Sequence, residues 1–258
     1  LPAERLDLLT DELTGLIRVL EQTTGRRVSE SRFTEIMHRA TEQAEHNAAA
    51  RDLVAAAVPA PVSVAETMPA VMVPQWHRGS SWARDAAAEF RAELRGRVIA
   101  GPAACPDERV RLMWLGRGLW SSLGLYQYFQ DAYGAVFVWS MYLGLAADGY
   151  ARYFDGRDPL RALAARFVTV GDELRMPTWS AAWHAKEAAL HQVDGVVSLG
   201  EDDYFSVRRL EAAGIPVLSL AADNVDRRTW GEDELKAAIG RFIEERALPA
   251  AERRHHAS

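Results

Sequence analysis

Four short apolar segments in the second half of the chain constrain the fold more than any other feature. They are rich in β-branched and aromatic residues and lie at 110–115, 135–139, 195–199 and 215–220. Stretches with the apolar spacing of a helix separate them. Because parallel neighbours need such crossover helices, the pattern predicts an α/β fold: a doubly wound, mostly parallel four-stranded sheet with helices on both faces.

The first hundred residues carry no strand pattern. Apolar residues repeat at helical spacing over 6–20 and 33–44, which predicts a hairpin of two helices. Four prolines within 59–79 predict a broken path of short helices and extended links. A Gly-Pro pair then opens a linker, so we expect an N-terminal helical subdomain at 1–101 and a doubly wound domain at 102–258.

Charge and cysteine content exclude several classes of protein. The net charge of -6 comes from interspersed acidic and basic residues, which argues against a nucleic-acid partner. No apolar run approaches the roughly 18 residues of a membrane span. Cys105 is the only cysteine, so the chain has no intramolecular disulfide, and a reducing, cytoplasmic location is expected. Because the sequence starts at Leu1 rather than Met, we expect a processed or trimmed piece of a longer chain.

Ligand contacts are expected in the loops that follow the strands, since ligands of parallel sheets lie outside the carboxyl ends of the strands. Gly116-Arg117-Gly118 allows close backbone approach and offers one cation, but it has too few glycines for a dinucleotide fingerprint. It is therefore either a plain turn or a phosphate cradle. The other substrate-binding candidates follow the second and fourth strands: Ser140, Met141, Tyr142, Asp223, Asn224 and Arg227.

An acidic cluster follows the third strand and supplies the catalytic candidates Glu201, Asp202, Asp203 and Tyr204. Adjacent carboxylates can exchange protons with a ligand or bind a metal. The alternative is that Asp202 or Asp203 only caps the next helix.

Three histidines, His77, His184 and His191, are candidates for proton transfer. Their spacing matches no zinc motif, and no Gly-x-Ser-x-Gly motif indicates a hydrolase, so no metal site is predicted. For each of them, a core or solvated histidine is the favoured interpretation.

Aromatic residues are concentrated between Trp114 and Phe154. Most are expected in the core, and some are free to line an apolar pocket for a hydrophobic acyl or aryl group.

The order of several motifs resembles the 2-hydroxyacyl-CoA dehydratase and benzoyl-CoA reductase family. These are "EQTTGRRVSESRF", "ERVRLMWLGRGLW", and a late run in which "VDGVV" precedes "GIPV" and the loop of Asp223 and Arg227. The resemblance implies paired, related subunits, each with two doubly wound domains that share a cysteine-held 4Fe-4S cluster. It also implies an acyl-CoA substrate and an ATP-dependent activator. The activator's electron converts the thioester to a ketyl radical, followed by loss of hydroxyl or by ring reduction.

Two departures from the family pattern concern the cluster. The family's first domain has no counterpart ahead of Leu1, and Glu201 to Phe205 occupy the place of the expected second-domain cysteine. One thiolate cannot hold a cubane cluster, so the cofactor stays undetermined. Two hypotheses follow: a dehydratase-like or reductase-like enzyme subunit with altered chemistry, or a non-catalytic partner. In the second, Trp76, Trp82 and Trp120 would serve an interface with a related subunit or a second copy.

Overall fold

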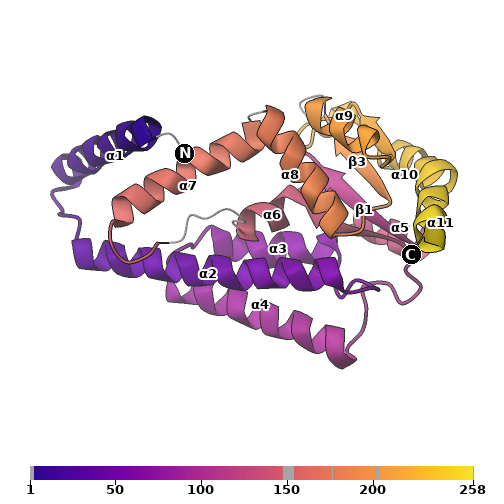
Figure 1. Cartoon of the computed structure of the whole chain (residues 1–258), viewed down its shortest axis with the longest axis horizontal. Coiled ribbons are helices and arrows are strands. Elements are labelled where there is room, and N and C mark those ends of the chain that lie inside the picture. Colours follow the sequence, from indigo (N-terminus) through magenta and orange to yellow (C-terminus); the bar gives the residue numbers. More distant parts are fainter. Residues whose placement is uncertain (1–2, 148–153, 176, 201–203, 258) are drawn as a thin grey trace.

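The computed structural model describes residues 3–147, 154–175, 177–200 and 204–257. Its first part is helical, with α1 (Ala3–Thr24), α2 (Glu30–Ala56), α3 (Val64–Gln75) and α4 (Ser81–Ala100). α2 packs against α4, and α1 packs against α7 (Pro159–Arg175) at the end of the molecule away from the sheet (Figure 1). The predicted hairpin of the first two helices is therefore replaced by two other helix pairs.

The proline-rich stretch is only partly the broken path that was predicted: Pro59 and Pro61 lie in a non-helical link, but a continuous helix follows it. α3 continues through both Pro69 and Pro74. Its fully buried residues Val64, Met68 and Val71 pack into the core, and this burial outweighs the backbone hydrogen bonds that proline removes.

The sheet has four parallel strands in the order β2-β1-β3-β4, which confirms the predicted fold class. The strands are β1 (Val110–Leu115), β2 (Ala135–Ser140), β3 (Gly195–Leu199) and β4 (Val217–Leu220). β1, β2 and β3 are buried along their whole length, so both faces of the sheet are covered.

Helices cover the two faces of the sheet. The intervening elements are η1 (Trp120–Ser122), α5 (Gly124–Tyr133), α6 (Met141–Ala147), α8 (Pro177–Leu190), α9 (Tyr204–Ala212), η2 (Arg227–Thr229), α10 (Glu232–Phe242), a π turn (Ile243–Ala247) and α11 (Leu248–Ala257). One apolar core holds residues of α2, α8 and α9, and the other holds residues of α3, α5, α10 and α11. α11 lies beside the sheet, at the opposite end of the long axis from α1 (Figure 1).

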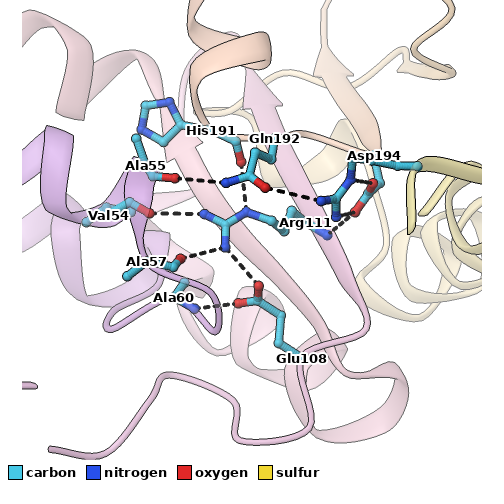
Figure 2. Close-up of polar contacts among 10 residues, drawn as sticks. Val54, Ala55, Ala57, Ala60, Glu108, Arg111, His191, Gln192 and Asp194 are labelled. Carbon is cyan, nitrogen blue, oxygen red and sulfur yellow. Dashed lines mark hydrogen bonds and ion pairs between the residues drawn. The ribbon is translucent and has the colours of Figure 1, made fainter. Parts of the chain in front are cut away.

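A buried arginine ties the helical part to the sheet. Arg111 of β1 is 1% exposed, and its guanidinium donates to the carbonyl oxygens of Val54, Ala57 and His191 at 2.7–3.0 Å. It also donates to Glu108 at 2.8 Å, and Glu108 in turn accepts from the backbone of Ala60 (Figure 2). The end of α2 and the end of α8 are thus fixed to one strand. The predicted boundary between 1–101 and 102–258 stays a prediction.

No helix among the described residues is both long enough and apolar enough to cross a bilayer.

Candidate functional site

The strand order places a topological switch point between β1 and β3. From β1 the chain moves to β2 on one side, and from β2 it crosses back to β3 on the other side. The loops after β1 and β3 therefore diverge, and ligands of such sheets bind in the crevice between them. The ends of the two strands are in contact before the chain diverges: a Cβ on Gly116, whose φ is +92°, would lie 2.5 Å from the carbonyl oxygen of Leu199, the last residue of β3. Only glycine fits that position.

The turn after β1 is fixed from both sides. The Trp114 indole donates to the Arg117 carbonyl at 3.0 Å, and the Gly118 amide donates to the Tyr142 hydroxyl at 3.1 Å. A Cβ on Gly118 would lie 2.4 Å from Met68 Cε. Because its amide already has a partner, Gly118 acts here as a turn residue, while the exposed Arg117 side chain is the cation that this turn presents.

The residues after β2 lie at the same edge of the sheet. Ser140 is fully buried and its hydroxyl oxygen has no hydrogen-bond partner. Met141 and Tyr142 are half-buried at the start of α6. Of the predicted substrate-binding residues, the structure brings Gly118 and Tyr142 into direct contact.

Asp223 organises the loop after β4. Its Oδ1 accepts from the backbone amides of Val225 and Asp226 at 2.7 and 3.1 Å. These hydrogen bonds, with a smaller contribution from the charge of Arg117, lower the pKa of Asp223. Its carbonyl accepts from the Trp230 indole at 2.9 Å. Asn224 lies half-buried in the same loop.

Arg227 joins this loop to the turn after β1. Its guanidinium lies 4.3 Å from the centre of the Trp230 ring and donates to the Ser122 hydroxyl at 2.5 Å. Arg227, from the loop after β4, is thus held by Ser122, which lies four residues after Gly118 in the segment that follows β1.

Three of the four catalytic candidates, Glu201, Asp202 and Asp203, lie outside the described residues. The fourth, Tyr204, is the first residue of α9 and is 64% exposed.

The histidines have different environments. His77 packs edge-on against Trp82, with ring centroids 5.1 Å apart. His184 is 4% exposed, contacts the Ser206 hydroxyl at 2.8 Å, and has a pKa lowered to about 4 by burial. Burial likewise lowers the pKa of His191 to about 4. His184 and His191 are therefore core groups that are neutral at pH 7.

Sequence analysis missed a buried carboxylate on the sheet face next to α8. Glu187 is fully buried, accepts from the Trp139 indole at 3.0 Å, and lies 3.8 Å from an Arg51 nitrogen. Burial raises its pKa. The spacing of His184, Glu187 and His191, three and four residues apart, would have placed all three on one helical face.

The donor set does not fit an iron–sulfur cluster. The described residues contain no group of three or more His, Cys, Asp or Glu side chains able to hold a metal. Cys105 lies before β1, at the opposite edge of the sheet from the switch-point loops, and lines a cavity of about 340 Å³ with Asp107 and Gln130. Burial raises the pKa of its thiol, which disfavours the thiolate that iron requires.

These observations define a class: a doubly wound α/β protein whose candidate ligand site is built from loops at the switch point. The family comparison is more specific. The family model of the 2-hydroxyglutaryl-CoA dehydratase D-component matches residues 1–245, and the chain belongs to this family. Its single cysteine agrees with the predicted lack of cluster ligands. No protein with a curated description matches the chain significantly.

Proposed function

We propose that this chain is a subunit of a 2-hydroxyacyl-CoA dehydratase-like or benzoyl-CoA reductase-like enzyme that acts on a CoA thioester or related acid derivative. The observation that carries the proposal is the family match over residues 1–245. The switch-point loops support it, because Arg117 is exposed in the turn whose next residue, Gly118, contacts the Tyr142 hydroxyl, and Arg227 is held by Ser122 in the segment that follows this turn. Arginines suit the phosphates of a CoA derivative, and a part-apolar surface suits its acyl group.

The proposed chemistry uses the segment that joins β3 to α9. In the sequence, this segment follows the carboxyl end of a strand, which is where catalytic groups of parallel sheets are usually found. Its candidate residues are Glu201, Asp202, Asp203 and Tyr204. In a cluster-free subunit, Glu201 or Asp202 acts as a general base beside the thioester. The proposed mechanism has no step at an iron–sulfur cluster, since the described donor set does not fit one.

The cysteine content favours a second candidate function: a non-catalytic, cluster-free subunit that supports a related catalytic chain. In either case we propose pairing with a related subunit or a second copy, and an ATP-dependent activator as a further partner. The proposal includes a cytoplasmic location and the division into a helical part, 1–101, and an α/β part, 102–258.

The first experiment measures iron and acid-labile sulfide after anaerobic purification, with the chain alone and together with a cysteine-rich relative. Iron and sulfide only in the complex would support the partner function. Absence in both, with acyl-CoA turnover, would support cluster-free catalysis. Stoichiometric iron and sulfide in the chain alone would contradict both cluster-free forms of the proposal and would support cluster-based dehydratase chemistry in this subunit.

Two variants then test the catalytic residues. Glu201→Gln and Asp202→Asn each keep the size of the side chain but remove its basicity. If one of them is the base, its variant loses turnover by about 10²-fold or more while acyl-CoA binding persists. Full turnover in both variants would exclude the carboxylates as bases.

A further inference from the structure

Three aromatic side chains from three separate segments form a row that begins beside the turn after β1 and ends at an exposed tryptophan. Tyr142 of α6 contacts Trp120 of η1, with ring centroids 5.4 Å apart and planes at 68°. Trp120 contacts Trp76 at the end of α3, with centroids 6.4 Å apart and planes at 34°. Tyr142 and Trp120 are half-buried, whereas Trp76 is 68% exposed. We call this row the aromatic ladder.

The inner end of the ladder is anchored to the backbone. The Tyr142 hydroxyl accepts from the Gly118 amide, so its own hydrogen is free to be donated elsewhere. A Cβ on Gly118 would lie 2.9 Å from the Tyr142 ring, so the contact depends on the absence of a side chain there. The ladder therefore starts from the turn that the strand order places at the ligand crevice.

A cation is held by the same short helical turn that carries the middle ring. Ser122, which holds Arg227, belongs to the same short helical turn as Trp120. Stacking on Trp230 holds the guanidinium plane, and only one of its five N–H groups is used by Ser122. The turn that carries the middle ring thus also holds a guanidinium donor that suits phosphate or carboxylate oxygens.

We infer that the aromatic ladder is a subsite for the planar aromatic ring of the ligand, with an anionic group of the same ligand bound by Arg227. This deepens the proposed function and rests on it, because it specifies which part of a CoA-type ligand these residues recognise. Two sources supply such a ring: the adenine of the CoA moiety and an aryl group on the acyl side. The ladder starts at the turn after β1, where ligands of parallel sheets bind, which favours a small molecule as its occupant.

The test compares binding of acetyl-CoA and benzoyl-CoA by calorimetry in the full chain. Trp76→Ala removes the outer ring, and because that residue is largely exposed the fold should be unaffected. Trp82→Ala is the matched control, since Trp82 is also half-exposed but packs on His77 outside the ladder. Loss of one stacking partner is expected to weaken binding about 2- to 12-fold.

Each outcome is decisive. Weakening of both ligands by Trp76→Ala, but not by Trp82→Ala, supports the subsite with adenine as the ring. Weakening of benzoyl-CoA alone supports the subsite with the aryl group as the ring. Unchanged affinity for both ligands in Trp76→Ala overturns the subsite while leaving the proposed function standing. If the wild-type chain binds neither thioester, the catalytic form of the proposed function falls and the subsite with it.

Discussion

Replacement of Arg111 by methionine tests how the helical part is joined to the sheet. Met keeps the apolar stem of the side chain but removes four hydrogen bonds, three to backbone carbonyls and one to Glu108. It also leaves the Glu108 carboxylate, whose side chain is 2% exposed, without its cation (Figure 2). Breaking a buried pair on one side costs about 3–5 kcal/mol. For a chain of this size that corresponds to a fall in Tm of roughly 6–20 °C.

The assay is thermal and urea unfolding of Arg111→Met beside a matched surface variant. Arg157→Met breaks the exposed pair with Asp155 and should leave Tm at the wild-type value. The double variant Arg111→Met/Glu108→Gln should recover part of the loss, because the uncompensated charge is gone. Equal midpoints for Arg111→Met and Arg157→Met would refute the reasoning.

Two further predictions concern buried histidines and glycines. The pKa values of His184 and His191 are lowered from 6.5 to about 4, so the stability they contribute is present above pH 6.5 and is lost as pH falls towards 4. The full loss is on the order of 3 kcal/mol for each histidine. The free energy of unfolding of His184→Gln, measured with urea, should therefore fall less between pH 7 and pH 5 than that of the wild type. An equal fall in both proteins would count against this prediction. Gly118→Ala should lower stability by about 1–3 kcal/mol and weaken ligand binding, because its Cβ would meet both the fully buried Met68 and the Tyr142 ring. Gly15→Ala in α1 meets nothing within 4 Å and should raise Tm slightly; the reverse order of the two midpoints would contradict both expectations.

The position of the candidate site could be predicted in part. Strand patterns located the loops after β1, β2 and β4, and the parallel arrangement put them at one edge. The contact between Gly118 and Tyr142 could not be predicted, since it depends on how α6 packs relative to the turn after β1. The same holds for Arg227, whose partner Ser122 lies 105 residues away in the sequence.

The sequence by itself determined the α/β class, because the period of apolar residues is a local property that each strand and helix carries in its own residues. It also determined family membership and the scarcity of thiolate ligands. Only the tertiary structure decided which helices pair, that α3 persists through two prolines, and that Trp76, Trp120 and Tyr142 form one row. These features depend on packing between segments far apart in the chain, where burial free energy outweighs local preference and leaves no periodic trace in the sequence.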